Sequence, residues 1–252
     1  MRRFIFFFLL GLFLSFIPQL VSGIAPVAPF KISETARQVT VRIYTPTVAG
    51  SGVIVGREGD RYTVVTNRHV VGDECGESDC KILTAEGLFY PAKLLSFAGL
   101  EDLDVAKVEF GSSSSYPVAK LGSYGGLEVG DVVYAVGFPN WRWRDEETVE
   151  NTRDLGLKAF TFTAGRVGMI PDRSLEEGYQ LGYTNDIVEG MSGGAIFNGR
   201  GELVGINGRA KYPLAGIEAF RFADGSLPSR GSFERMEALS WGIPIGTFRG
   251  FL

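Results

Sequence analysis

The sequence GMSGGA occupies residues 190–195 and places one serine, Ser192, in a short stretch with glycine on both sides. Glycine permits the backbone angles of a sharp turn, and because it has no Cβ another group can approach the main chain closely. A turn of this kind leaves the serine hydroxyl exposed. The plain alternative is a surface turn rich in Gly and Ser, so the stretch has to be judged together with the rest of the chain.

Two other stretches carry the partners that a serine nucleophile needs. The single histidine, His69, lies in VVTNRHVV at residues 64–71, and EDLDVAKV at 101–108 places Asp104 at the start of an apolar run. A serine hydroxyl is a weak nucleophile until a base such as histidine takes its proton. A carboxylate can orient that imidazole, and backbone N–H groups, here those of Gly190 and Ser192, can hold the developing oxyanion. The sequence therefore predicts a triad of His69, Asp104 and Ser192.

The order of these residues along the chain separates the folds that use such a triad. GMSGG also fits the Gly-x-Ser-x-Gly turn of α/β-hydrolases, but that fold needs its histidine after the serine, and none follows Ser192. A subtilisin-like order needs an aspartate before the histidine, and the one aspartate there, Asp60, lies in a predicted hairpin turn. Of the folds that use such a triad, the one with the order His, Asp, Ser consists of two β-barrels.

The remaining sequence indicates an all-β protein. Short apolar and β-branched runs recur between turns rich in Gly, Asp, Asn or Pro, and long helical periodicity is missing, which is typical of a barrel or sandwich. We expect strands at residues 39–44, 52–55, 62–66, 81–84, 89–95, 105–110, 132–136, 159–163, 195–197 and 203–206. We expect one short helix at 232–239 and two long loops at 141–156 and 209–230.

The N-terminus has the layout of an export signal. Arg2 and Arg3 precede an apolar run at residues 4–16, and the small residues Ser22 and Gly23 follow it. The alternative is an uncleaved membrane anchor, but the run is shorter than the roughly 20 residues of a spanning helix. The sequence therefore predicts cleavage after Gly23, a periplasmic or extracellular location, and no stable membrane association afterwards.

The predicted domain organisation follows from these elements. Residues 1–23 are expected to form the signal peptide and residues 24–37 a linker. Residues 38–124 and 125–252 are each expected to form a six-stranded antiparallel β-barrel, with the active site in the cleft between the two.

Charge and cysteine content restrict the partners. The formal net charge is -4, and no cluster of Lys or Arg occurs in the body of the chain, which argues against nucleic acid as a partner. Cys75 and Cys80 are the only cysteines, and in an exported protein a pair this close is expected to form a disulfide. A cysteine nucleophile near His69 is the alternative. Two thiols and one histidine leave a zinc site one ligand short, so we expect no metal and no cofactor.

Taken together, these stretches resemble the trypsin-like serine peptidases of the chymotrypsin fold, above all the bacterial HtrA/Deg-type protease domains. The resemblance covers about residues 38–247. It is carried by SGVIV at 51–55, VTNRHVV at 65–71, DVA at 104–106, VGFP at 136–139, GMSGGA at 190–195, LVGIN at 203–207 and WGIPI at 241–245. It implies a serine endopeptidase that cleaves protein or peptide substrates through an acyl-enzyme. The alternative within the same fold is a catalytically silent barrel that acts as a binding protein.

The resemblance also assigns positions around the triad. It aligns Asp104, and not Asp102, with the aspartate of the triad. Asp186 falls where some trypsin-like pockets carry the acid that binds Arg or Lys, although the plain alternative is an acid that caps a turn. The resemblance places three further residues beside the substrate pocket: Ile206, Asn207 and Gly208.

Two departures from the resemblance limit what it implies. Digestive relatives carry an aspartate directly before the serine to bind a newly freed N-terminus, and this chain has Met191 there. We therefore expect no zymogen switch of that kind. No PDZ domain is expected after the closing strand, and the oligomeric state stays open.

Overall fold

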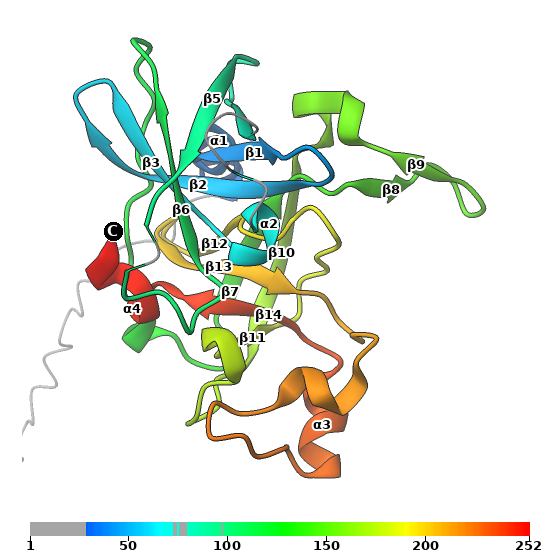
Figure 1. Ribbon diagram of the computed structural model, residues 1–252. Helices are drawn as coiled ribbons and strands as arrows, with labels where there is room; N and C mark the ends of the chain where they lie inside the picture. Colours follow the sequence, from blue (N-terminus) through cyan, green and yellow to red (C-terminus); the bar gives the residue numbers. More distant parts are fainter. Residues whose placement is uncertain (1–28, 73–74, 76–79, 97) are drawn as a thin grey trace, which may run out of the picture.

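The computed structural model describes residues 29–72, 75, 80–96 and 98–252 (Figure 1). The predicted signal peptide at residues 1–23 lies outside the described residues. None of the helices that the described residues form has the length and apolar character needed to cross a bilayer.

The first barrel forms between residues 40 and 111. In the described part of the chain six antiparallel strands close in the order β1-β2-β3-β6-β5-β4. Their bounds are β1 (Thr40–Tyr44), β2 (Ala49–Glu58), β3 (Arg61–Thr66), β4 (Cys80–Leu83), β5 (Phe89–Leu94) and β6 (Ala106–Gly111). Because successive side chains of a strand point to opposite faces, Val41 and Ile43 of β1 enter the barrel core and Arg42 points out of it.

The second barrel is closed in the same way as the first. Over the described residues its six antiparallel strands follow the order β10-β11-β14-β13-β12-β7. Their bounds are β7 (Val132–Gly137), β10 (Thr161–Met169), β11 (Leu181–Tyr183), β12 (Ala195–Asn198), β13 (Leu203–Arg209) and β14 (Ser240–Pro244). The prediction of an all-β fold with two six-stranded barrels is confirmed.

Helical segments join and cover the barrels. They are α1 (Pro29–Val39), α2 (Arg68–Val71), α3 (Arg230–Met236), α4 (Ile245–Phe248) and the 3₁₀ segments Tyr124–Gly126, Arg153–Ala159, Glu176–Gly178, Gly216–Phe220 and Arg249–Phe251. The helix predicted at 232–239 is present but shifted toward the N-terminus, because the Ser229 side chain caps it by accepting a hydrogen bond from the amide of Ser232.

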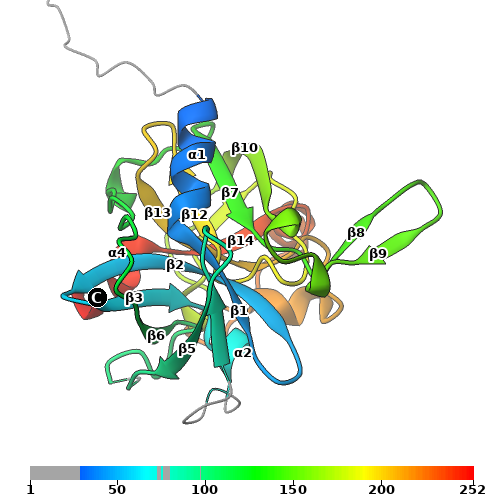
Figure 2. The ribbon, with the colours of Figure 1, turned by 90° about the horizontal axis from the view of Figure 1, so that it is seen from above.

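Three parts of the chain differ from the strand and loop predictions. Strand β10 is longer than expected, and β11 was not predicted as a strand. The expected loop at 141–156 contains a hairpin of β8 (Trp141–Trp143) and β9 (Val149–Asn151), which projects away from the barrels (Figures 1 and 2). Each of the two strands has only 3 residues, too few for an alternating pattern to indicate a strand.

Most of the segment predicted to be a linker is helical. Helix α1 begins at Pro29, and its residues Ile32, Ala36 and Val39 are buried on one face. Helix α1 contacts β1 and β2 of the first barrel, and Ile32 lies near Gly201 in the turn between β12 and β13 of the second. The predicted linker at 24–37 is therefore corrected over its described residues, because a helix with one apolar face packs there into an apolar cluster with residues of both barrels.

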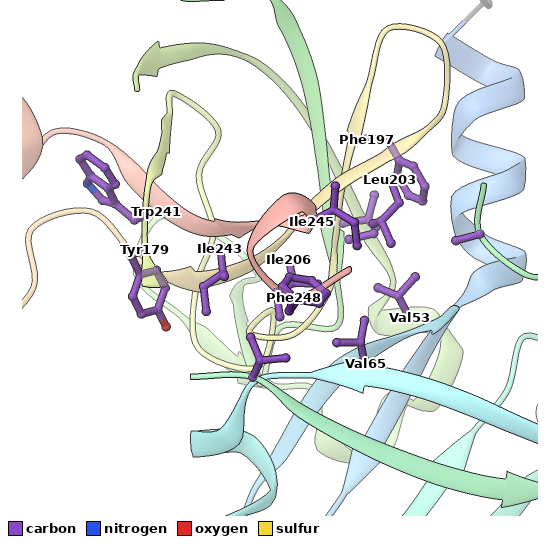
Figure 3. Close-up of a cluster of buried hydrophobic side chains, with 14 of the residues drawn as sticks. Val53, Val65, Tyr179, Phe197, Leu203, Ile206, Trp241, Ile243, Ile245 and Phe248 are labelled. Carbon is purple, nitrogen blue, oxygen red and sulfur yellow. The ribbon is translucent and has the colours of Figure 1, made fainter. Parts of the chain in front are cut away.

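A shared core joins the two barrels. One continuous cluster of buried side chains contains Val53 and Val65 of the first barrel together with Ile206 and Ile243 of the second (Figure 3). Helix α1 contributes to the same cluster. The relative placement of the barrels is thus set by apolar packing, and residues that lie at their junction are held in a defined geometry.

Candidate active site

Strand β3 and helix α2 place His69 at the junction of the barrels (Figure 1). Val70 and Val71 are buried and anchor the short helix, whereas the His69 side chain is about half exposed, at 49%. Asn67, just before the helix, donates from its side-chain amide to the backbone carbonyl of Asp104 at 2.8 Å. This bond ties the histidine segment to the aspartate segment.

The carboxylate of Asp104 lies against His69 and is only 5% exposed. Its Oδ2 is 2.7 Å from Nδ1 of His69, and its Oδ1 accepts a hydrogen bond from the His69 backbone amide at 2.9 Å. The hydroxyl of Tyr179, which comes from the second barrel, donates a further hydrogen bond to Oδ2. Asp104, not Asp102, is therefore the acid next to the histidine.

Opposing effects act on the ionisation of Asp104. Burial alone would raise the pKa of its carboxyl group, but the hydrogen bonds from His69 and Tyr179 and the adjacent imidazole charge outweigh burial, so the pKa lies below its ordinary value. Burial, and then the neighbouring carboxylate, raise the pKa of Tyr179 well above its ordinary value. Tyr179 therefore remains a hydrogen-bond donor to an ionised Asp104.

The turn around Ser192 depends on its glycines. Gly190 has φ +92° and Gly193 has φ +78°, and a Cβ on Gly193 would lie 2.2 Å from the hydroxyl oxygen of Thr66. Strand β2 of the first barrel holds this turn: the Ser51 hydroxyl donates to the carbonyl of Gly190 at 2.7 Å, and the Ser51 amide donates to the carbonyl of Ser192 at 2.9 Å. The two barrels therefore meet through the backbone that carries Ser192.

Two amides of this turn are available to a ligand. The amide of Met191 bonds to the carbonyl of Val188 at 3.0 Å, whereas those of Gly190 and Ser192 have no hydrogen-bond partner among the described residues. The carbonyl of Glu189 accepts from a backbone amide 2.8 Å away, outside the turn. Because the C=O and N–H of a trans peptide point in opposite directions, the N–H of Gly190 points away from the amide that binds the Glu189 carbonyl. Two such donors beside a hydroxyl can hold an oxyanion.

A small hollow between the barrels brings these groups together. Its volume is about 120 Å³, and its lining residues are Val48, Ala49, His69, Val70, Asn140, Glu189, Gly190 and Ser192. Within the described structure the Ser192 hydroxyl donates to the carbonyl of Gly208 at 3.3 Å and not to His69. Hydrogen bonds between catalytic groups are often absent or long before substrate binds, so this resting contact is compatible with a nucleophile and its base.

Two of the predicted pocket residues lie away from this hollow. The Asp186 side chain is 84% exposed and pairs with Nζ of Lys211 at 2.6 Å. Ile206 is fully buried in the shared core. Asp186 is thus a surface acid, and neither residue lines the hollow that contains Ser192.

The other two predicted pocket residues lie next to the turn. Asn207 is buried and hydrogen-bonded within the protein: its side chain donates to the carbonyl of Val136 at 2.8 Å and accepts from the Tyr183 hydroxyl at 2.8 Å. Its backbone exchanges hydrogen bonds with Gly193 and Gly194. Asn207 therefore holds the turn, whereas Gly208 presents its carbonyl to Ser192.

Sequence reasoning missed Tyr179 as a site residue. It lies in the shared core with its hydroxyl turned toward the first barrel (Figure 3). The Tyr179 ring also explains why residue 208 is a glycine, because a Cβ there would lie 2.3 Å from the Tyr179 ring and hydroxyl. A single tyrosine has no local sequence signal for such a role, since its partner Asp104 lies 75 residues away.

Cys75 and Cys80 form a disulfide with a Cα–Cα distance of 5.1 Å, so neither thiol is free to act as a nucleophile. No group of three or more His, Cys, Asp or Glu side chains able to hold a metal ion occurs among the described residues.

Comparisons with known proteins find similarity to serine proteases. Residues 50–206 match the family model of the Trypsin-like peptidase domain. The chain is 32% identical over 168 residues to the "Putative serine protease HhoA" of Synechocystis sp., covering 67% of this chain and 38% of that protein. It is 33% identical over 177 residues to a "Probable periplasmic serine endoprotease DegP-like" of Hahella chejuensis (69% and 32%) and 30% identical over 208 residues to the "Serine protease Do-like HtrA" of Bacillus subtilis (76% and 42%). The chain thus spans between about a third and two fifths of the length of these relatives.

Proposed function

Because this chain belongs to the trypsin-like peptidase family, we propose that it is an exported serine endopeptidase that cleaves protein or peptide substrates through an acyl-enzyme. The observation that carries the proposal is the small hollow that His69 shares with Ser192 and the amide of Gly190, with Asp104 hydrogen-bonded to the far side of the imidazole.

The proposed reaction assigns one role to each group. The Ser192 hydroxyl attacks the substrate carbonyl carbon while His69 takes its proton, and the resulting oxyanion accepts hydrogen bonds from the amides of Gly190 and Ser192. His69 then gives the proton to the leaving amine as the C–N bond breaks. A water molecule, deprotonated by His69, releases the acyl group as a carboxylic acid and restores the serine.

Asp104 supports the base in this scheme. Its carboxylate contacts Nδ1 of His69, which leaves Nε2 as the nitrogen that exchanges protons with Ser192. Because the pKa of Asp104 lies below its ordinary value, the carboxylate stays ionised and stabilises the imidazolium that forms during attack.

Export and domain limits are part of the same proposal. The basic start, apolar run and small residues before position 24 support an export signal, and the name of the Hahella relative includes "periplasmic". We propose a barrel boundary near residue 124, because the described chain between β6 and β7 passes there from one barrel to the other.

The first prediction concerns the nucleophile. Ser192→Ala is expected to lower kcat on casein roughly 10⁴- to 10⁶-fold, since the hydroxyl that forms the acyl bond is lost. Ser232→Ala is the matched control, because Ser232 lies on α3 with its hydroxyl bonded only to Ser229 in the described structure.

Labelling by a fluorophosphonate separates the peptidase from a silent binding barrel. The wild type and Ser232→Ala are expected to react and Ser192→Ala is not. A wild-type protein that neither reacts nor cleaves casein would overturn the proposed activity and leave a binding barrel.

A further inference from the structure

Arg42 on β1 is a fully buried arginine without an acidic hydrogen-bond partner in the described structure. A buried cation is strongly disfavoured unless its donors are satisfied, and arginine remains protonated at physiological pH. Burial lowers the pKa of Arg42, as expected for a charge removed from water. The free energy lost by removing this guanidinium from water has to be offset by the interactions that the buried side chain makes.

The guanidinium of Arg42 crosses from the first barrel to the chain between β7 and β10 of the second. Its terminal nitrogens donate to the Thr152 carbonyl at 2.8 Å and to four acceptors at 3.4 Å: the carbonyls of Pro139 and Gly156, the Thr152 hydroxyl and Oδ1 of Asn140. One side chain thus contacts both ends of the segment that includes the β8–β9 hairpin, with a short hydrogen bond to Thr152 and longer ones to Pro139 and Asn140.

That turn is the element that orients the Glu189–Gly190 peptide. The Asn140 backbone amide donates to the Glu189 carbonyl at 2.8 Å, and the Asn140 side chain donates to the Ala49 carbonyl at 2.8 Å. With the Glu189 carbonyl held by Asn140, the Gly190 N–H is directed away from Asn140, and Gly190 lines the hollow together with Ser192.

The orientation of the Glu189–Gly190 peptide depends on hydrogen bonds from residues outside the turn. Gly190 has a positive φ, and glycine has a wider range of backbone angles than other residues, so the peptide plane could turn with little local resistance. A turned peptide would direct the Glu189 carbonyl, an acceptor, toward the place where an oxyanion develops. Repulsion would then replace a hydrogen bond in the transition state.

We propose that Arg42 is a positioning residue for the oxyanion hole: by holding Pro139 and Asn140 it keeps the Gly190 N–H directed at the reacting carbonyl. This inference rests on the proposed peptidase function. Arg42 itself touches no substrate and acts through Asn140.

The kinetic experiment uses Arg42→Met, which keeps a long apolar chain and removes all donors. We expect kcat on a peptide ester to fall about 10- to 100-fold with KM within about twofold, because the lost hydrogen bond forms only in the transition state. The affinity for a peptide boronic acid, whose tetrahedral adduct occupies the same hole, is expected to fall by a similar factor. Equal kcat in the variant and the wild type would overturn the inference.

Arg249→Met is the matched control, because Arg249 also donates to a backbone carbonyl of another segment, that of Gly122 at 3.2 Å. This variant is expected to lower the melting temperature and leave kcat and boronate affinity unchanged. If Arg42→Met likewise changed only the melting temperature, Arg42 would be a structural brace and the inference would be wrong.

Thr152→Val covers the case in which Arg42→Met does not fold. It removes a hydroxyl that accepts from Arg42 and donates to the Pro139 carbonyl, and it should lower kcat about 3- to 10-fold with KM unchanged. An unchanged kcat in this variant would count against the inference.

Crystal structures make the test independent of activity. The Glu189–Gly190 peptide is expected to be turned or split between two orientations in the altered protein and single in the wild type. A wild type that fails to react with a fluorophosphonate would overturn the proposed function alone, whereas an unchanged peptide in Arg42→Met or Thr152→Val would overturn the positioning role alone.

Discussion

At the residue scale, the environment of Asp104 decides how the site is charged. Its carboxylate is buried, yet three donors from two residues surround it, and one of these residues, Tyr179, belongs to the other barrel. The donors compensate for burial and keep the pKa of Asp104 below its ordinary value. Loss of one donor should therefore affect both stability and the ionisation of the site.

Tyr179→Phe tests this balance. We expect it to lower the free energy of unfolding at pH 7 by about 1 to 3 kcal/mol, because a buried carboxylate loses a hydrogen bond. A carboxylate whose folded pKa is lowered contributes stability that is present above its unfolded pKa of about 4 and lost as pH falls through the folded pKa. The difference between variant and wild type should therefore narrow below about pH 4.

Urea unfolding of both proteins at pH 7 and pH 3 measures this difference. Tyr212→Phe serves as the control, because its side chain is exposed. A difference that is the same at both pH values would mean that Tyr179 acts through packing alone.

The sequence predicted the three proposed catalytic residues and missed the residues that support them. Ser192 and His69 lie in local motifs whose glycines and neighbours are constrained by nearby backbone, so the pattern is visible in a few residues. Tyr179 and Arg42 act on partners about 75 and 100 residues away. Their roles depend on how the barrels pack, which no local pattern encodes.

At the element scale, α1 is the main difference between prediction and structure. The helix begins at Pro29, and proline is well suited to the first position of a helix, because a backbone N–H at that position would have no intrahelical partner. The buried positions Ile32, Ala36 and Val39 are spaced as one face of a helix. With so short an apolar face, the helix depends on packing into the apolar cluster that both barrels share.

Ile32→Ala should therefore destabilise the protein by about 2 to 4 kcal/mol, since Ile32 is 1% exposed and its loss leaves a cavity. Phe30→Ala, on the same helix but 71% exposed, should change stability by less than about 0.5 kcal/mol. Chemical denaturation compares the two. Similar values for both would show that α1 is not packed as described.

At the scale of the whole molecule, one of the buried apolar clusters contains residues of both barrels, so the barrels are expected to unfold together. Val53 and Val65 from the first barrel pack in the same cluster as Ile206 and Trp241 from the second. The order His, Asp, Ser predicted two barrels, but it could not predict this shared cluster, because its members come from elements distant in sequence.

A single unfolding transition is therefore expected in urea. Of the three tryptophans, Trp241 is fully buried in β14 and the other two lie in β8, so the change in fluorescence that follows exposure of Trp241 reports on the second barrel. Amide exchange in β3 peptides reports on the first. Exchange of β3 at lower urea than the fluorescence change would show that the first barrel unfolds independently.

The orientation of the Ser192 hydroxyl has a kinetic consequence. Rotation about one side-chain bond takes picoseconds to nanoseconds, whereas an enzyme turns over in milliseconds or longer. The contact with Gly208 therefore cannot delay the reaction. The hydroxyl leaves the Gly208 carbonyl by rotation of the Ser192 side chain alone, so a bound substrate that favours another rotamer breaks this contact without any movement of the backbone.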